Sequence, residues 1–165
     1  MKKLNFGCGT KIKNGWTNVD LQKAKGIDKS FDFNKYPYPL KDNTFDYIFL
    51  DMVLEHLPNP QNVLKELWRI GKPNATIKII VPYYNSYIAH GDHTHVNFFN
   101  EWSLQQALGQ SGYLHEKQKE QFEILKMKAV PQRFLRFMPK PMLNILKKLL
   151  GNVVVILDAE VKVLK

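Results

Sequence analysis

Short apolar runs that favour β-strands alternate with helix-like patterns along most of this chain. Strands that alternate with helices indicate a parallel sheet with right-handed crossovers. Residues 62–70 have the apolar spacing of a helix that ends at Gly71, and Asn100 begins a second helix that stops within residues 109–112. The runs that predict strands are residues 3–6, 16–21, 27–31, 45–50, 77–81, 122–128 and 153–164.

The last two strands are joined by a helix-rich insertion with many proline and basic residues. We expect these two strands to be antiparallel at one edge of the sheet. The predicted fold is α/β, with a Rossmann-like, doubly wound, mostly parallel sheet of seven strands. A length of 165 residues suits one domain. We therefore expect residues 1–165 to form a single domain with a basic amphipathic insertion at about residues 130–150.

Basic residues are concentrated in and before this insertion. The formal net charge is +9, and residues 126–148 contain seven lysines and arginines and no acidic residue. A field of this sign favours polyanions such as nucleic acid or an anionic membrane surface. The insertion is interpreted as a helical flap that packs Leu143, Leu146 and Leu150 on the sheet, a lid over an apolar acceptor, an interfacial anchor or an RNA contact. Its phenylalanines and methionines favour lipid or a lid over RNA.

The cysteine content and the first residues of the chain indicate the cellular compartment in which the protein is expected. Cys8 is the single cysteine, so no internal disulfide can form, which fits a reducing cytoplasm. Met1, Lys2 and Lys3 look like the basic start of a signal peptide, but no apolar region follows them before Gly7. We therefore expect a cytoplasmic protein.

The first strand leads directly into a glycine-rich turn, Gly7-Cys8-Gly9, and Asp20 ends the second strand. In a doubly wound sheet this places a close backbone approach beside a carboxylate that can bind a ribose diol. A dinucleotide site needs a third glycine and a helix whose N-terminus holds the pyrophosphate. Lys11 stands at the position of that glycine, and the crossover is too short for a helix. The spacing therefore favours a nucleoside cofactor without phosphates, such as S-adenosylmethionine.

Five short motifs follow in order: LNFGCG at residues 4–9, GWTNVD at 15–20, DNTFD at 42–46, VLEHL at 53–57 and RIGKP at 69–73. Together they resemble the class I S-adenosylmethionine-dependent methyltransferases of the type 11 kind, and the resemblance covers about residues 4–104. The chain departs from the family pattern in its short first crossover and in Asn74-Ala75, where the family usually has two glycines.

The resemblance implies a binding site for S-adenosylmethionine, built from residues that follow the first four strands. Local roles are the alternatives, with Asp20 as a turn cap and Asp32 as the first residue of a turn before Asn34. The implied contacts are Gly7 and Gly9 at the methionine part, Asp20 with Leu21 at the ribose, Asp32 and Phe33 at the adenine, and Asp51 and Met52 at the floor of the pocket.

Residues 83–99 contain three of the five histidines and follow the fifth strand, so this segment reaches the edge of the sheet where ligands bind. We call it the histidine loop. Two functions compete for it: a general base with a polar binding surface, and a metal site. The spacing fits no zinc motif, and we expect no metal. The residues of the alternative metal site are His90, Asp92, His93 and His95.

Methyl transfer to a hydroxyl group needs a base, and histidine is the natural type near neutral pH. His95 is the first choice for the catalytic role, because Asp92 could hold its other ring nitrogen and fix the tautomer. His90 and His56 are the catalytic alternatives, and plain hydrogen bonding within the loop is the structural one.

We therefore expect an S-adenosylmethionine-dependent methyltransferase that transfers a methyl group to an oxygen or nitrogen of a small, sugar-linked or lipid-linked acceptor. One alternative is an RNA methyltransferase, and another is a non-catalytic domain that binds S-adenosylmethionine. The expected partners are the acceptor and, through residues 126–148, an anionic membrane surface or RNA in weak contact. Dimerisation is a further option, because a second copy could close the cofactor site.

Overall fold

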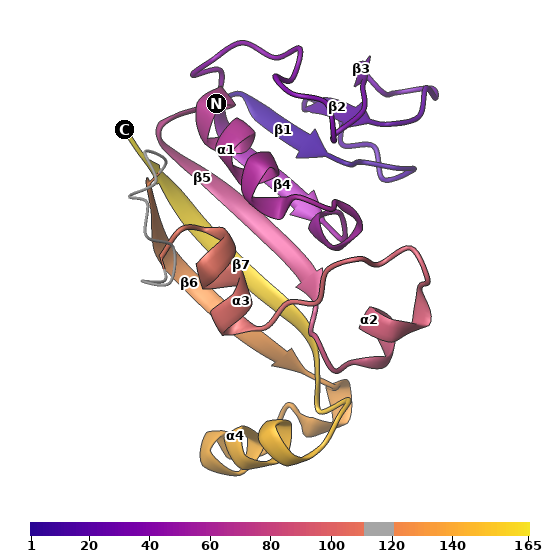
Figure 1. The fold of residues 1–165 in the computed structure, drawn as a ribbon, viewed down its shortest axis with the longest axis vertical. Helices are drawn as coiled ribbons and strands as arrows, with labels where there is room; N and C mark the ends of the chain where they lie inside the picture. Colours follow the sequence, from indigo (N-terminus) through magenta and orange to yellow (C-terminus); the bar gives the residue numbers. More distant parts are fainter. Residues whose placement is uncertain (111–120) are drawn as a thin grey trace.

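The computed structural model describes residues 1–110 and 121–165, and its strands form one sheet (Figure 1). The strands are β1 (Lys3–Phe6), β2 (Thr17–Asp20), β3 (Lys29–Ser30), β4 (Phe45–Asp51), β5 (Gly71–Pro82), β6 (Gln121–Pro131) and β7 (Val154–Leu164). Their spatial order is β3-β2-β1-β4-β5-β7-β6, and neighbours from β3 to β5 are parallel. Strand β7 is antiparallel to both β5 and β6. This order confirms the predicted fold class and its antiparallel C-terminal edge.

Strand β5 begins at Gly71, earlier than the predicted residues 77–81. Residues 72–75 bulge out of its ladder with β4, and regular pairing starts at Thr76. Asn74 has a φ of 64° in this bulge, a left-handed conformation that asparagine adopts more readily than most residues. The asparagine that replaces the family's glycine therefore lies in a bulge, outside the regular ladder of β5.

The helices are α1 (Pro60–Ile70), α2 (Tyr87–Gly91), α3 (Glu101–Ala107) and α4 (Lys140–Leu149), with short 3₁₀ turns η1 (Leu54–His56) and η2 (Arg133–Leu135). Helix α1 confirms the prediction for residues 62–70. Helix α3 begins as predicted, because the Asn100 side chain accepts a hydrogen bond from the Ser103 amide and Ser103 Oγ accepts one from the Asn100 amide. The helix ends before Gly109, which has a φ of 75°, and Gly112 of the predicted stop lies outside the described residues.

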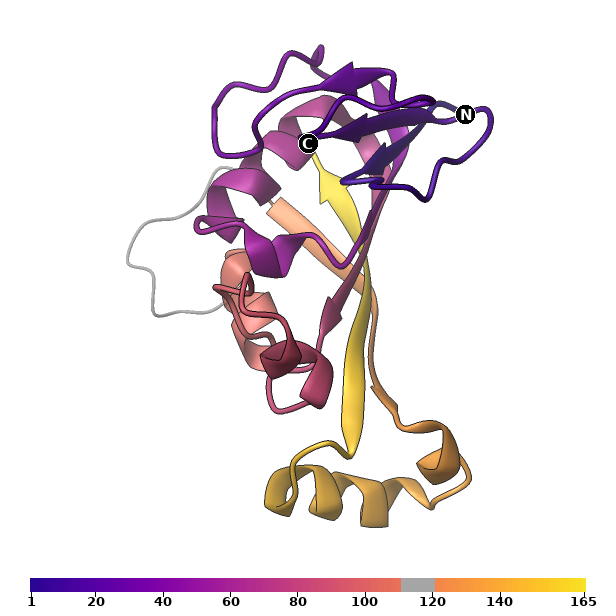
Figure 2. The same ribbon diagram turned by 90° about the vertical axis from the view of Figure 1, so that its right-hand side faces the viewer.

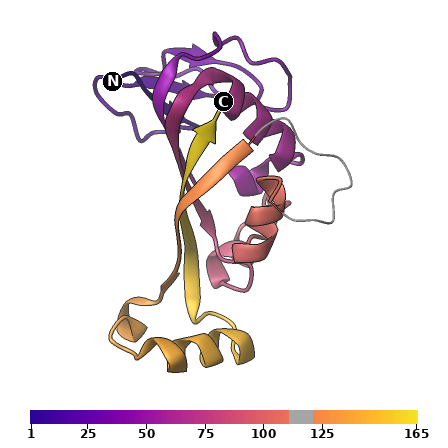
Figure 3. The same ribbon diagram turned by 90° about the vertical axis from the view of Figure 1, so that its left-hand side faces the viewer.

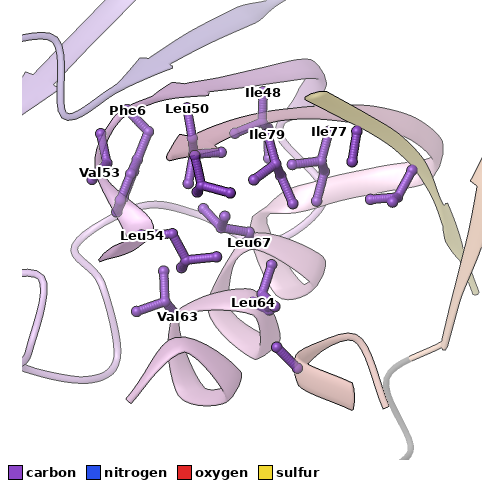
Figure 4. Close-up of a cluster of buried hydrophobic side chains, with 14 of the residues drawn as sticks. Phe6, Ile48, Leu50, Val53, Leu54, Val63, Leu64, Leu67, Ile77 and Ile79 are labelled. Atoms are coloured by element: carbon purple, nitrogen blue, oxygen red, sulfur yellow. The ribbon is translucent and has the colours of Figure 1, made fainter. Parts of the chain in front are cut away.

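Helices α1 and α3 cover one face of the sheet (Figure 2, Figure 3). Along β4, Ile48 and Leu50 are fully buried, whereas Tyr47 and Phe49 are partly exposed. This alternation is typical of a sheet with one face on the core. Figure 4 shows the core between the sheet and α1; its labelled side chains are Phe6, Ile48, Leu50, Val53, Leu54, Val63, Leu64, Leu67, Ile77 and Ile79.

The β6–β7 hairpin extends beyond the rest of the sheet and carries residues 131–150, which we call the basic arm (Figure 1, Figure 2). Leu143 and Leu146 pack against the core as predicted. The expectation for Leu150 is wrong, because this side chain is exposed. Leu150 follows the last residue of α4 with extended backbone angles, φ −124° and ψ 138°, which take it off the helical face. None of the helices in residues 1–110 and 121–165 is long and apolar enough to cross a bilayer.

Candidate active site

The glycine-rich turn after β1 is the first part of the candidate site. Gly7 has a φ of 68° and Gly9 a φ of 49°, both in the left-handed region that favours glycine. A Cβ atom on Gly7 would lie 2.5 Å from Cγ2 of Val53, so the turn packs directly on the segment after β4. A Cβ atom on Gly9 would have nothing within 4 Å outside its own neighbours. The absence of a side chain at Gly7 therefore lets the turn pack closely on Val53, whereas Gly9 lies next to open space.

Asp20 lies beside this turn at the end of β2. Its Oδ2 accepts a hydrogen bond from the Gly9 amide at 2.7 Å, and its Oδ1 accepts one from the Gln22 amide at 3.1 Å. The side chain is partly exposed, and the next residue, Leu21, is exposed. A carboxylate has about four lone-pair positions, so Asp20 caps the turn and still has capacity for ligand hydroxyl groups.

Asp32 and Phe33 follow β3 and lie in different surroundings. Oδ1 of Asp32 accepts a hydrogen bond from the Asn34 amide at 2.9 Å, which is the local turn considered as its alternative role. Phe33 is buried and stacks on Phe6, with the ring centroids 4.0 Å apart. One face of the Phe33 ring therefore belongs to the core, and a contact of either residue with adenine stays a prediction.

Lys11 crosses from the loop after Gly9 to the end of β4. Its Nζ lies 2.9 Å from Oδ2 of Asp51, in an ion pair that is largely exposed on the lysine side. Met52, the next residue, has a φ of 56°, and a left-handed conformation is uncommon for such a side chain. The sequence placed Asp51 at the floor of a cofactor site but gave no sign that Lys11 would pair with it.

The histidine loop leaves the sheet and returns to it beside β5. Tyr83 forms a parallel bridge with Phe99, and the amides of Val96 and Asn97 donate hydrogen bonds to the carbonyl of Glu55 at 2.9 Å and 3.0 Å. Glu55 belongs to η1, which follows Val53 and the end of β4. The loop therefore lies at the same edge of the sheet as the glycine-rich turn.

His95 is a partly buried histidine of this loop, and its side chain is 5% exposed. Its Nδ1 lies 2.8 Å from the carbonyl oxygen of Ala89, which can only accept, so Nδ1 carries the proton of the neutral ring and Nε2 is left as an acceptor. Nε2 lies 3.9 Å from Oδ2 of Asp92 and 4.0 Å from Oε1 of Glu55. The prediction that Asp92 fixes the tautomer is therefore wrong, because the Ala89 carbonyl does so through the other nitrogen.

His56 contacts His95, with ring centroids 4.6 Å apart in an edge-to-face arrangement. The Thr94 hydroxyl donates to Oδ1 of Asp92 at 2.6 Å, so at 2.9 Å it accepts from Nδ1 of His56. His90 instead is exposed and stacks on Phe98, with ring centroids 4.8 Å apart. The structure thus brings together two of the three candidate catalytic histidines and leaves His90 apart.

Glu55 is the site residue that sequence reasoning missed. Its side chain is 1% exposed, and neither carboxyl oxygen has a hydrogen-bond partner within the described parts of the chain. Burial raises the pKa of Glu55 to about 7, and the negative charges of Asp51 and Asp92 add to the rise. The only sequence signal was an acidic residue within the apolar motif at residues 53–57.

Three of these side chains are close enough to share a metal ion. Glu55, His56 and His95 each offer a ligand atom, and the three atoms lie within 4.8 Å of one another. This group differs from the one considered from the sequence, since His93 is exposed and Asp92 faces Thr94. A carboxylate with two imidazoles suits a divalent transition metal, and the expectation of no metal stays a prediction.

Residues 4–79 match the family model described as a methyltransferase domain. A stretch of 44 residues is 39% identical to demethylmenaquinone methyltransferase of Anoxybacillus flavithermus, over 27% of this chain and 19% of that protein. A longer stretch of 102 residues is 26% identical to cycloartenol-C-24-methyltransferase 1 of Oryza sativa subsp. japonica, over 48% of this chain and 30% of that protein. The chain thus spans less than a third of the length of these curated relatives.

Among solved structures, a SAM-dependent methyltransferase from Archaeoglobus fulgidus superposes with a TM-score of 0.65 and 18% identity. The match covers 98% of this chain and 85% of that one, and at this identity it shows a shared fold. The motifs within residues 4–79 agree with that fold. The chain therefore has the fold of S-adenosylmethionine-dependent methyltransferases, and its residues 4–79 match a methyltransferase domain.

Proposed function

We propose that this chain is an S-adenosylmethionine-dependent methyltransferase that acts on an oxygen or nitrogen of a small, sugar-linked or lipid-linked acceptor. One juxtaposition carries the proposal: the turn at Gly7 packs on Val53, and two residues later Glu55 contacts the loop that holds His95. In this proposal the turn binds the nucleoside cofactor and His95 acts as a base, both at the edge of the sheet where α/β folds bind ligands.

The residues around the glycine-rich turn fit the cofactor. The open space at Gly9 gives room for the methionine part, and Asp20 would hold the ribose hydroxyl groups. Lys11 and Asp51 have charges opposite to the carboxylate and ammonium groups of that part. Their exposed ion pair contributes at most about 1 kcal/mol, so a ligand can displace it. When bound, S-adenosylmethionine supplies a methyl group already activated on a sulfonium sulfur.

His95 would serve the acceptor side as the base. Because Ala89 holds the protonated Nδ1, Nε2 is free to receive the proton of an acceptor hydroxyl group. The ring then becomes positive, and the carboxyl groups of Glu55 and Asp92, at 4.0 Å and 3.9 Å, would stabilise that charge. The protein's remaining task is to align the two reactants, which is the main contribution to a displacement of this kind.

The surface of the histidine loop supports an acceptor with an apolar part. Four of its large aromatic or aliphatic side chains are exposed: Tyr84, Tyr87, Val96 and Phe98. An apolar group bound over the loop would cover them, and removal of that surface from water favours binding. The names of the curated relatives, which are methyltransferases for demethylmenaquinone and cycloartenol, also support this class of acceptor.

Binding of the cofactor tests the proposal directly. At about a hundred times its Kd, S-adenosylmethionine or S-adenosylhomocysteine should raise the free energy of unfolding by roughly 2.7 kcal/mol. Asp20→Asn should weaken binding, measured by calorimetry, by about tenfold or more, because a hydrogen bond that involves a charged group contributes about 1.5–3 kcal/mol. Asp46→Asn is the matched control, since Asp46 lies at the opposite end of β4 and pairs with Lys72.

The outcomes separate the alternatives. A folded sample that binds neither compound would contradict the proposal. Binding without methyl transfer to any fraction of a cell extract would favour the non-catalytic domain. With tritiated cofactor, we expect the label in a lipid or small-molecule fraction, and label in the RNA fraction would instead favour the RNA methyltransferase.

A further inference from the structure

The basic arm has an apolar surface that the described parts of the chain leave uncovered. Phe137 is 96% exposed and Phe134 is 74% exposed. Helix α4 has no buried residue, and its Met142, Ile145 and Leu149 are exposed. At about 100° per residue, these three side chains form one stripe along the helix. Soluble proteins seldom expose so many large apolar side chains together, and such patches mark binding surfaces.

Cations border this apolar surface. Lys147 is paired with Glu101 of α3 at 2.8 Å, which holds the inner side of α4 to the body of the protein. The other cations of the arm are exposed and form no ion pair with a carboxylate of residues 1–110 or 121–165: Arg133, Arg136, Lys140 and Lys148. By helical position, Lys148 lies next to Ile145 on the flank of the stripe.

The arm leaves the sheet at the edge that holds the candidate active site. Ile156, near the start of β7, pairs with Pro82 at the end of β5. Asn152 ties the base of the arm to the histidine loop, because its Oδ1 accepts from the Tyr87 amide at 2.7 Å and its amide donates to the Asn85 carbonyl at 3.1 Å. A partner on the arm would therefore lie beside the acceptor side of the site (Figure 1).

We propose that the basic arm docks on an anionic lipid surface, with the stripe and the two phenylalanines among the lipid headgroups and the cations on the phosphates. An apolar face with adjacent cations is the pattern of interfacial helices. A symmetric dimer through this surface would bring the same cations of two copies together. RNA would use the cations but not the aliphatic stripe. The inference goes beyond the proposed methyl transfer and does not depend on it.

Co-sedimentation of the full chain with vesicles tests the proposal. We expect binding to vesicles of equal parts phosphatidylcholine and phosphatidylglycerol, weaker binding as salt is raised, and little binding to pure phosphatidylcholine. The double variant Arg133→Gln, Arg136→Gln should lower partitioning roughly fivefold per charge removed. The matched control removes two exposed lysines far from the arm, Lys23→Gln and Lys25→Gln, and should have a much smaller effect.

A second variant tests the apolar part of the surface. Phe134→Ser with Phe137→Ser should lower partitioning at least roughly tenfold, and both side chains are so exposed that the fold should persist by circular dichroism. Leu125→Ser is the control, since Leu125 is a large exposed side chain on β6 outside the arm. Unchanged partitioning of the phenylalanine variant would overturn the proposal.

Three further results would overturn it. The first is no preference for anionic over pure phosphatidylcholine vesicles. The second is tight binding of single-stranded RNA at physiological salt together with no vesicle binding, which would assign the cations to nucleic acid. The third is a dimer in sedimentation equilibrium that Phe134→Ser with Phe137→Ser dissociates while vesicles do not bind. Cofactor binding, measured separately, is unaffected by any of these outcomes.

Discussion

Nε2 of His95 lies 4.0 Å from Oε1 of Glu55, a carboxyl group that is 1% exposed. Both side chains come from segments that follow parallel strands, η1 after β4 and the histidine loop after β5. At this distance in a buried place, the charge of each group affects the other far more than it would in water. Glu55 and His95 therefore belong to one local cluster, and variants of the two should have different consequences.

Substitution of His95 should separate turnover from cofactor binding. Loss of a general base commonly lowers the rate by about 10²–10⁴, so His95→Ala should lower kcat by at least roughly a hundredfold while the Kd for S-adenosylmethionine stays within about twofold. His90→Ala is the control from the same loop, because His90 is exposed and stacks on Phe98. If His90→Ala loses turnover and His95→Ala keeps it, the role belongs to His90.

Chelation distinguishes a base from a metal ligand. The ligand atoms of Glu55, His56 and His95 lie within 4.8 Å of one another, so a divalent metal is the competing explanation of this cluster. We expect turnover to be unchanged after treatment with EDTA and gel filtration. Activity that is lost in this way and returns with Zn²⁺ or Mn²⁺ would reassign His95 as a ligand.

The Glu55 carboxyl should make stability depend on pH. Burial raises its pKa from 4.5 to about 7 in the folded state, so between these values the folded protein binds more protons than the unfolded one. The free energy of unfolding should then fall as pH rises from 4.5 to 7 and level off above 7. The full loss is on the order of 3 kcal/mol.

Glu55→Gln has nearly the same shape and cannot ionise, so it isolates this contribution. The difference in unfolding free energy between the wild type and Glu55→Gln, from urea melts, should change by on the order of 3 kcal/mol between pH 4.5 and pH 8. A difference that does not vary with pH would show that the carboxyl group keeps its ordinary pKa after folding.

Sequence patterns were sufficient to locate the seven strands because turn-forming residues bound each apolar run. They placed the start of β5 too late, since the bulge at residues 72–75 has no apolar signal although it belongs to the strand. They also assigned Leu150 to the packed face of the arm. The periodicity continues through Leu150, but the helix ends at Leu149, and periodicity alone does not detect the end.

The sequence was sufficient to predict which loops form the site, but not which side chains and backbone groups contact one another there. Parallel strands bring the segments after β1, β2, β4 and β5 to one edge, so the places of Asp20 and the histidine loop followed from the predicted parallel sheet. His95 is held by the backbone carbonyl of Ala89. Every residue has such a carbonyl, so the amino-acid sequence does not indicate which one will accept the hydrogen bond. The burial of Glu55 depends on how the loop covers η1, which is a tertiary property.

The two glycines of the first turn should respond differently to alanine. In Gly7→Ala the new methyl group would meet Val53 at 2.5 Å in a left-handed backbone, and overpacking with strain costs about 2–4 kcal/mol. Gly9→Ala meets open space, so only the backbone cost of about 1–2 kcal/mol applies. Urea melts measure both values.

Gly9→Ala should have a small effect on stability but a large effect on cofactor affinity. Its methyl group would enter the space proposed for the methionine part of the cofactor, so Gly9→Ala should remain folded and lose at least roughly tenfold in affinity. Undiminished binding of S-adenosylmethionine by folded Gly9→Ala would show that the cofactor does not approach this turn.

Lys147 should fix α4 to the body of the protein. Its ammonium group lies 2.8 Å from Oε1 of Glu101, whose other oxygen accepts from the Tyr83 hydroxyl at 2.8 Å. Burial by itself would raise the pKa of Glu101, but these hydrogen bonds outweigh it and lower the pKa, so the carboxylate is charged at neutral pH.

Lys147→Met keeps the apolar stem and removes the charge, and a pair of this kind contributes about 0.2–1 kcal/mol. Amide hydrogens of α4 should then exchange roughly two- to fivefold faster, whereas Lys148→Met, at the exposed neighbouring position, should leave exchange unchanged. Equal effects of the two variants would mean that α4 is held by Leu143 and Leu146 alone.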